Sequence, residues 1–360
     1  MKILHRGQIS SPLGAKLNYN AWGSILTLAD GTIICVWSGD RYAHICPFGR
    51  VLASRSIDGG YTWTPPYTVQ NTPLDDRDAG LCWAGGRLVL TSFNNSRAQQ
   101  RYYADAGKYP PAKRAFVESY LDLVTDEEEK KYLGATLAIS RDGGYTFSEP
   151  QVMPITSPHG PLTLPDGSLL WIGRAFGDRA PASFAYLPEG LYAMRLSPDG
   201  EVIEQPWLVV PKCPEEGTLY CEPHAALMPD GSILLAIRVQ NGANKLFTVY
   251  LCRSTDGGKT FTAPMATGWD GSPPHILVTR TGTVVLTYAR RRPPFAECAR
   301  ISRDSGLSWS EEIVLCDDAP TGDIGYPCTA ENDRGELVTI YYQNNPGRGS
   351  QMDSIIWTVE

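Results

Sequence analysis

The chain has 360 residues, 42% of them hydrophobic and 20% charged, so it can bury a sizeable core, and wholesale disorder is excluded. Its formal net charge of −7 excludes the basic surface that nucleic acids or anionic membranes require. No apolar run reaches the roughly 18 residues of a membrane-spanning helix, and the 35 glycines and 28 prolines predict many turns.

The N-terminal segment MKILHRGQIS loses its apolar run at His5 and Arg6, whereas a secretory signal peptide needs about 7–15 apolar residues. The nine cysteines form no CxxC pair, and several lie within apolar runs, such as Cys35 and Cys252. These two features predict reduced thiols in a cytoplasmic protein. The sequence has no GxGxxG after a strand, no P-loop and no zinc signature, so we expect no cofactor and no metal ion.

A β-hairpin pattern recurs along the chain: a strand, a polar turn centred on glycine, and a strongly apolar strand. The first copy is ILTLADGTIICVW and the fourth is AALMPDGSILLAI. The glycine supplies the left-handed conformation that a tight turn requires. Six copies occur, centred on Gly31, Gly86, Gly167, Gly231, Gly282 and Gly335.

A second, shorter repeat follows most of these hairpins. It reads SIDGGYTW, SRDGGYTF, STDGGKTF and SRDSGLSW, with a degraded copy SPDGE. We expect its aspartate to accept hydrogen bonds from the backbone N–H groups of a turn, and the aromatic residue to enter the core. The aspartates of the four good copies are therefore predicted to be structural: Asp58, Asp142, Asp256 and Asp304.

Together the two patterns make four strands per unit of about 50–60 residues, which is typical of a β-propeller blade. Six units predict an all-β, six-bladed β-propeller that forms a single domain over residues 1–360. The last unit ends at the strand SIIWTVE and lacks an outer strand. We expect the N-terminal KILHRGQI to supply that strand, because closing the ring removes an exposed sheet edge.

The interval between the second and third hairpins is the longest, and it contains an insertion in blade 2 at residues 97–134. Phe116, Tyr120 and Val124 recur at helical spacing, and Thr125 with Glu128 forms a capping box, so we expect short helices. Two roles stay open for the insertion. It is either a surface element that joins copies of the chain into a homo-oligomer, or a lid over one end of the ring.

In a propeller the innermost strand of each blade begins at one mouth of the central channel, where the second strand ends. Polar side chains gather at these positions. The substrate-binding candidates that begin first strands or end second strands are His159, His224, His275, Arg174, Arg238, Arg290, Arg291 and Arg292. Guanidinium groups bind carboxylates, so the mouth is predicted to hold an acidic sugar. For any one of these histidines or arginines, a structural role stays open.

The turn motif in a six-bladed propeller resembles the sialidase (neuraminidase) and Asp-box repeat superfamily, over the chain outside residues 97–134. The resemblance implies a retaining glycosidase with a tyrosine nucleophile, a neighbouring glutamate, an acid/base aspartate and three arginines that bind the substrate carboxylate. Tyr326 in DIGYPCTA matches the nucleophile, and Glu222 in CEPHAAL matches its partner. Arg238 follows Glu222 by 16 residues and matches the second arginine, and one of the run Arg290–Arg292 matches the third.

The chain departs from the family at blade 1. In NYNAWGSIL, Ala21 stands where the family has the first arginine of its carboxylate clamp. Arg41 and Arg77 are the candidates to replace it, since both are predicted at the same mouth. The acid/base residue is also open, with three candidates there: Asp40, His44 and Asp78.

Three functions from different classes follow. The first is an exo-acting glycoside hydrolase that removes a terminal acidic sugar from a glycan or oligosaccharide with retention. The second is a uronate lyase or rhamnosidase-like enzyme, in which His44, His224 or His275 acts as acid or base and Tyr326 as proton donor. The third is a propeller that binds carbohydrate without catalysis, which the missing arginine favours. All three predict a carbohydrate partner, and none predicts a nucleic acid or a membrane.

Overall fold

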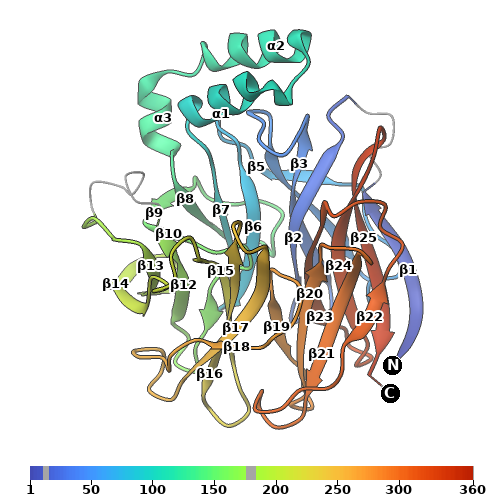
Figure 1. Cartoon of the computed structure of the whole chain (residues 1–360). Helices are drawn as coiled ribbons and strands as arrows, with labels where there is room; N and C mark the ends of the chain where they lie inside the picture. Colours follow the sequence, from blue (N-terminus) through green and yellow to red (C-terminus); the bar gives the residue numbers. More distant parts are fainter. Residues whose placement is uncertain (11–15, 176–183, 360) are drawn as a thin grey trace.

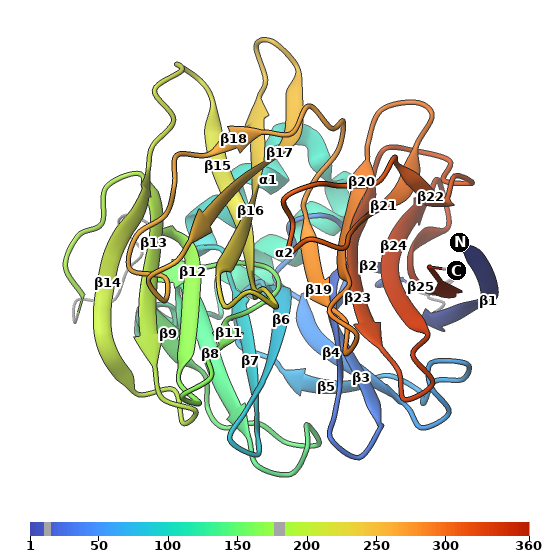
Figure 2. The same cartoon turned by 90° about the horizontal axis from the view of Figure 1, so that it is seen from below.

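The computed structural model describes residues 1–10, 16–175 and 184–359. Six antiparallel sheets stand around a central axis (Figure 1; Figure 2), so the six-bladed β-propeller predicted from the repeats is confirmed. Three short α-helices accompany the strands within these described residues.

Within the blades, strands that follow one another in the chain are neighbours in the sheet, except that β10 and β11 of blade 3 both pair with β12 and that β1 joins blade 6 from the other end of the chain. Blade 1 consists of β2 (Tyr19–Thr27), β3 (Ile33–Arg41), β4 (Arg50–Ser56) and β5 (Tyr67–Gln70), and blade 2 of β6 (Arg77–Ala84), β7 (Arg87–Phe93), β8 (Ala135–Ser140) and β9 (Gln151–Met153). Blade 3 consists of β10 (Ile155–Thr156), β11 (Leu162–Thr163), β12 (Leu169–Ala175), β13 (Gly190–Leu196) and β14 (Val202–Pro211), and blade 4 of β15 (Leu219–Leu227), β16 (Ile233–Asn241), β17 (Leu246–Ser254) and β18 (Met265–Ala266). Blade 5 consists of β19 (His275–Val278), β20 (Val284–Arg290), β21 (Ala296–Ser302) and β22 (Ile313–Cys316), and blade 6 of β23 (Ile324–Glu331), β24 (Leu337–Asn345), β25 (Gly349–Thr358) and β1 (Lys2–Ser10).

The first and last strands of the chain lie side by side in blade 6. Strand β1 pairs antiparallel with β25, so that Ile3 faces Trp357 and Gly7 faces Ser354. The two termini consequently lie close together (Figure 1). The N-terminal segment thus covers the edge that β25 would otherwise expose.

Hydrophobic side chains are buried mainly between blades rather than within one. Each pair of neighbouring blades shares one cluster of buried residues. In one of them Trp171 of blade 3 packs with Val89 and Leu137 of blade 2, and in another Trp37 of blade 1 packs with Ile340 of blade 6. Full burial of one large apolar side chain contributes about 1.5–3 kcal/mol, so each interface stabilises the ring.

The repeated aspartates close their turns through side-chain hydrogen bonds. Asp142 Oδ1 accepts from the Ser140 hydroxyl at 2.7 Å and from the Thr146 N–H at 3.0 Å, and Oδ2 accepts from the Thr146 hydroxyl at 2.6 Å. The turns at Asp58, Asp256 and Asp304 repeat these contacts. The hydroxyl of Ser308, followed by its N–H, lowers the pKa of Asp304 to about 2.

These turns also fasten each blade to the preceding one. Arg55 of blade 1 donates to the Gly143 carbonyl in the turn of blade 2, at 2.8 and 2.7 Å. Gly144 follows with φ +94°, and a Cβ at this position would lie 2.6 Å from Ile34 of blade 1. Glycine is required there because the turn is left-handed and pressed against the neighbouring core.

The insertion predicted in blade 2 connects β7 to β8 and is helical. It consists of α1 (Arg97–Tyr103), the π-helical turn η1 (Ala104–Lys108), α2 (Pro111–Leu121) and α3 (Asp126–Tyr132). The capping box of Thr125 and Glu128 is present at the start of α3. In Figure 1 the three helices lie together at one end of the ring, above blades 1 and 2.

A pair of alanine substitutions tests how the turns fasten the blades. Gly143→Ala introduces left-handed strain in open space, since only Arg55 lies within 4 Å of the added Cβ, and should cost about 1 kcal/mol of unfolding free energy. Gly144→Ala adds the clash with Ile34 and should cost about 1–3 kcal/mol more. Urea denaturation of both variants measures the difference, and equal losses would show that the turn does not press on blade 1.

Candidate active site at the propeller mouth

Four blades share an irregularity near the start of the innermost strand. Four residues there have left-handed backbones, with φ between 47° and 58°: Trp22, Asp78, Glu222 and Tyr326. Each lies in a break of the register between the first and second strands of its blade, which marks a β-bulge. Bulges re-aim side chains, and left-handed conformations are costly for residues other than glycine, so such positions are typical of functional sites.

The side chains of Glu222 and Tyr326 meet across the ring. The Tyr326 hydroxyl donates a hydrogen bond to Glu222 Oε1 at 2.8 Å. Arg238 Nη1 donates to Glu222 Oε2 at 2.6 Å and to the Tyr326 oxygen at 3.3 Å. Burial, followed by the negative charge of Glu222, raises the pKa of Tyr326 well above its ordinary value. The phenol is neutral until a base takes its proton, and Glu222 is placed to do so.

A second guanidinium group lies beside Arg238. The Arg291 guanidinium stands over the Tyr326 ring, 5.3 Å from its centroid, and donates to the Tyr342 hydroxyl at 3.1 Å. In the described part of the chain it has no carboxylate within 4.0 Å, and its Nε has no hydrogen-bond partner. A partly buried cation without a close ion pair attracts an anion, and two adjacent guanidinium groups suit a carboxylate.

Asp78 faces the same centre from blade 2. Its carboxyl group is buried, and its Oδ1 has no hydrogen-bond partner among the residues described. Arg77 Nε lies 3.7 Å from that oxygen. Burial raises the pKa of Asp78 to about 6, against the opposing charge of Arg77. The group can therefore hold a proton close to neutral pH and release it.

Asp40 and His44, the other two acid/base candidates, lie in different surroundings. The Asp40 side chain is 42% exposed and pairs with Arg50 at 3.5 Å. The His44 ring packs edge-on against Trp22, with centroids 4.8 Å apart, and its Nε2 lies 3.3 Å from Arg77 Nη2. Burial and the positive charge of Arg77 lower the pKa of His44 to about 2, so this imidazole is neutral and a weak base.

Arg41 and Arg77, the candidates to replace the missing arginine, belong to a buried ion network with Asp75. Arg41 Nη2 contacts Asp75 Oδ1, and Arg77 Nη1 lies 3.7 Å from Asp75 Oδ2. Both guanidinium groups lie over the Trp22 ring, 5.1 and 4.2 Å from its centroid. Arg41 is fully buried, and its ion pair is with Asp75. Arg77 also lies beside the Asp78 carboxyl group and orients it.

The three consecutive arginines at the end of β20 separate in space. Arg290 is paired with Glu312, and Arg292 is paired with Asp270. Arg291 is the member of the run that faces Tyr326. The register of β20 decides which member turns inward, because successive residues of an extended chain point to opposite sides.

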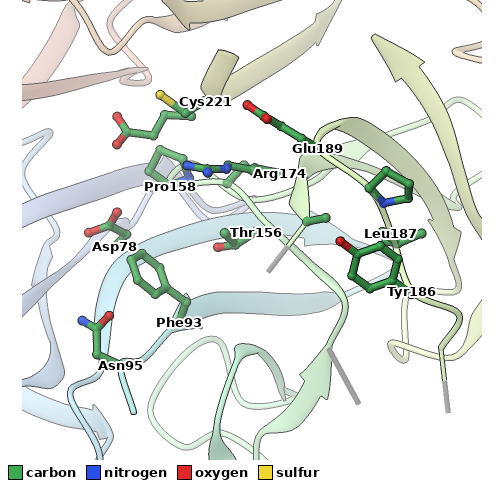
Figure 3. A pocket seen from close by; sticks show the side chains of 14 residues that line it. Asp78, Phe93, Asn95, Thr156, Pro158, Arg174, Tyr186, Leu187, Glu189 and Cys221 are labelled. Carbon is green, nitrogen blue, oxygen red and sulfur yellow. The ribbon is translucent and has the colours of Figure 1, made fainter. Parts of the chain in front are cut away.

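A cavity of about 460 Å³ opens beside Asp78 and Glu222 (Figure 3). This volume is in the range of about 300–1,000 Å³ that small-molecule pockets occupy. Figure 3 shows the Arg174 side chain reaching into the cavity toward the side of Asp78. Other side chains on its wall offer hydrogen-bonding groups or aromatic faces: Phe93, Asn95, Thr156, Tyr186 and Glu189.

His159, His224 and His275 also come together, but in a different cavity. Their ring centroids lie 4.4–5.3 Å apart, and they line a space of about 330 Å³ whose wall does not include Asp78 or Glu222. His224 and His275 accept backbone N–H groups of the next blade at Nδ1, at 3.0 and 3.3 Å. Burial lowers the pKa of all three, to about 3 for His159. Neutral rings held in this way join blades 3 to 6.

Two aromatic residues of the mouth were missed from the sequence. Trp22 supports the guanidinium groups of Arg41 and Arg77, and Phe247 lies 5.0 Å from Arg238. A signal for Trp22 does exist, because Trp22, Glu222 and Tyr326 each stand nine residues before the hairpin glycine of their own blade: Gly31, Gly231 and Gly335. No comparable pattern marks Phe247.

Comparison with known proteins identifies the family. The profile of the BNR repeat-like domain matches residues 114–339, well over half of the chain. The chain belongs to this family. The resemblance to the sialidase and Asp-box superfamily is thus confirmed. No curated protein sequence matches the chain significantly.

Solved structures show the same fold in several proteins. A protein of unknown function from Dyadobacter fermentans matches 99% of this chain and 98% of its own, with a TM-score of 0.74 and 21% identity. NanB sialidase from Streptococcus pneumoniae matches 99% of this chain and 71% of its own, with a TM-score of 0.69 and 11% identity. The leech intramolecular trans-sialidase matches 94% of this chain and 67% of its own length, with a TM-score of 0.63 and 17% identity. At these identities the likeness establishes the fold.

Three further properties concern the described residues. None of their helices is long and apolar enough to cross a membrane. No group of three or more His, Cys, Asp or Glu side chains among them could hold a metal ion. The nine cysteines, all described, form no disulfide.

The three buried histidines predict a steep loss of stability in acid. A histidine whose pKa is lowered by folding binds its proton more readily in the unfolded chain, so stability falls as pH drops below about 6.5. Each such group changes the free energy of unfolding by about 1.4 kcal/mol per pH unit in that range. His224→Asn keeps an acceptor for the Ile276 N–H and should flatten the pH dependence by one such increment in urea titrations. His5→Asn, on β1 outside the cluster, is the control, and equal flattening in both variants would contradict the prediction.

Proposed function

We propose that this protein is a retaining exo-glycosidase that removes a terminal acidic sugar, with Tyr326 as nucleophile and Glu222 as the group that accepts its proton. The main support for this proposal is the 2.8 Å hydrogen bond between these two side chains, which come from left-handed bulge residues of different blades. Sialidases are the glycosidases that use a tyrosine nucleophile. The membership of the BNR repeat-like family and the fold shared with sialidases support this proposal.

The substrate carboxylate is assigned to Arg238 and Arg291. Arg291 lacks a carboxylate partner within the described residues and lies over Tyr326, so a carboxylate bound there stands next to the nucleophile. Where the family has the first arginine of its clamp, this chain has Ala21, and the ring of the adjacent Trp22 is buried and covered by Arg41 and Arg77. The proposed clamp therefore has two arginines. Two guanidinium groups suit a sugar acid whose one carboxylate accepts hydrogen bonds through both of its oxygens.

Asp78 is assigned as the acid/base group, because its pKa of about 6 lets it carry a proton in mildly acidic solution. In the first step Tyr326 forms a bond to the anomeric carbon, Glu222 takes the phenol proton, and Asp78 protonates the departing oxygen. In the second step Asp78 takes a proton from water, the water oxygen bonds to the anomeric carbon, and the tyrosine leaves and regains its proton from Glu222.

The other two functions become outcomes of the tests below. A lyase that uses His44 as its base is disfavoured because that imidazole has a pKa of about 2. An unsaturated product that absorbs in the ultraviolet would nevertheless replace the glycosidase by a lyase. Binding of sugar acids without any product would indicate a carbohydrate-binding propeller.

Substitution of the nucleophile is the first test. Tyr326→Phe removes the hydroxyl and keeps the ring, so turnover of 4-methylumbelliferyl N-acetylneuraminic acid should fall at least about 1,000-fold while the fold is retained. Tyr341→Phe, a buried tyrosine of the same blade that bonds Cys316 instead, should turn over the substrate normally. Normal turnover by Tyr326→Phe, in a preparation that unfolds like the wild type, would exclude Tyr326 as the nucleophile. Glucuronides belong in the same panel, because the clamp recognises the carboxylate.

The second test concerns the proton donor. An acid with a pKa of about 6 loses its proton above that pH, so turnover of the wild type should fall on the alkaline side of about pH 6. In Asp78→Asn this limb should disappear, and turnover of 3′-sialyllactose should fall by about 100–10,000-fold. The loss should be much smaller for the 4-methylumbelliferyl glycoside, whose leaving group departs without protonation. Equal losses for both substrates would exclude Asp78 as the acid.

A further inference from the structure

Arg291 is held at the mouth by a neutral side chain rather than by an acid. Its Nη2 donates to the Tyr342 hydroxyl oxygen at 3.1 Å, and no carboxylate of the described residues lies within 4.0 Å of its guanidinium group. The backbone at Gly325 closes the other side, where an added Cβ would lie 3.3 Å from Nη2 and 2.7 Å from Ala289 Cβ. The guanidinium group therefore has a defined place beside Tyr326, the residue that follows Gly325.

The Tyr342 hydroxyl connects Arg291 to a carboxylate. It donates to Asp323 Oδ1 at 2.9 Å. A phenol has one O–H to donate and an ionised carboxylate can only accept, so the same oxygen accepts from Arg291. Burial raises the pKa of Tyr342, although the charge of Arg291 acts against it, so the phenol keeps its proton. The contact is thus an ion pair in which a neutral hydroxyl group stands between the two charged groups.

Asp323 is fixed in place by further neutral donors. The Tyr19 hydroxyl of blade 1 lies 3.1 and 3.0 Å from the two carboxylate oxygens and donates to them. Asn344 of β24 donates from Nδ2 to Oδ2 at 2.7 Å and from its backbone N–H to the Asp323 carbonyl at 3.0 Å. No arginine or lysine of the described residues lies within 4.0 Å of this carboxylate. Its position is therefore set independently of Arg291, and it can orient Tyr342.

Strand register brings these contacts next to the proposed nucleophile. Tyr342 of β24 pairs with Gly325 of β23, directly before the bulge residue Tyr326. Tyr342 is 1% exposed, and its ring centroid lies 6.3 Å from those of Tyr326 and Trp22. A side chain buried in this way acts on a substrate through its neighbour Arg291.

We propose that Tyr342 and Asp323 are positioning residues that orient Arg291 toward the substrate carboxylate. The inference rests on the proposed function, in which Arg238 and Arg291 bind that carboxylate. A direct ion pair with Asp323 would use the donors of Arg291 and offset its charge, so the substrate would have to displace an acid. The hydroxyl instead occupies Nη2 and leaves Nε, which has no partner among the described residues, for the substrate.

The competing interpretation is that Tyr342 only packs in the core between blades 6 and 1. In that case removal of its hydroxyl lowers stability and changes the binding of charged and neutral ligands equally. The two interpretations therefore differ in whether the effect of the hydroxyl requires a negative charge on the ligand.

Calorimetry of N-acetylneuraminic acid and of its methyl ester tests the hydroxyl. Tyr342→Phe keeps the buried ring and removes the bonds to Asp323 and Arg291, so it should weaken binding of the acid about tenfold and leave the ester unchanged. The matched control is Tyr341→Phe, a neighbouring buried tyrosine that bonds Cys316, and it should change neither ligand. Equal effects of Tyr342→Phe on both ligands, or none on the acid, would overturn the proposal. It would also be overturned if the native chain bound the acid no more tightly than the ester.

A double-mutant cycle tests whether Asp323 acts through Tyr342. Asp323→Asn removes the charge that aligns the phenol and should by itself weaken binding of the acid by a similar factor. In the Tyr342→Phe background the same substitution should cause no further loss, because the connection to Arg291 is already broken. Losses that multiply in the double variant would exclude Asp323 as a positioning residue.

Turnover separates this inference from the proposed function. If the native chain hydrolyses 4-methylumbelliferyl N-acetylneuraminic acid, Tyr342→Phe should raise KM about tenfold and leave kcat nearly unchanged. A lower kcat at unchanged KM would indicate a structural defect and overturn the proposal. Absence of turnover by the native chain, together with weaker binding of the acid alone in Tyr342→Phe, would remove the glycosidase and keep the positioning role. Unchanged binding of the acid would overturn the inference even if Tyr326 proved essential.

Discussion

Closure of the ring is the constraint on which the rest of the structure depends. Strand β1 completes blade 6 by pairing with β25, and each neighbouring pair of blades buries a shared hydrophobic cluster. The mouth draws Asp78 from blade 2, Glu222 from blade 4 and Tyr326 from blade 6, so no single blade contains the site. Since the Asp-box turns press on the preceding blade, the structural repeat and the placement of these three side chains are coupled. A weakened interface should therefore disturb distances at the mouth as well as stability.

The same backbone feature, a β-bulge, occurs at the mouth in four blades. A bulge near the start of the innermost strand holds one residue in a left-handed conformation and turns its side chain toward the axis. Such residues are strained by about 1–3 kcal/mol each, and the ladders on either side of the bulge hold them in place. In three blades the residue is a titratable group, and in blade 1 it is Trp22. The departure from the family, at Ala21, lies directly before this bulge residue.

Charge at the mouth is arranged differently from charge on the whole chain, which carries a formal −7. Arg41 and Arg77 are compensated by Asp75 and Asp78, and Arg238 by Glu222. Arg291 lacks such an ion-pair partner in the described residues. The other three of these arginines are paired with carboxylates, so the positive charge of Arg291 is the one among them that can attract an incoming anion. Because these groups are buried or partly buried and most of them are bonded to one another, they need little reorganisation when a charge arrives, which is the condition for strong electrostatic binding and catalysis.

The sequence alone determined the repeat, the six blades and the helical character of the insertion, because hairpins, Asp-box turns and capping boxes are read over a few neighbouring residues. It also marked Tyr326, Glu222 and Arg238 as residues to meet at one mouth, through the family pattern. Only the tertiary structure decided which of the arginines 290–292 faces Tyr326, that Asp78 rather than Asp40 is buried at the centre, and that the three histidines occupy a separate cavity. These outcomes depend on strand register, burial and contacts between blades more than 100 residues apart, such as the 104 between Glu222 and Tyr326. Short sequence patterns do not encode the distances between residues of different blades, since these distances arise only when the ring closes.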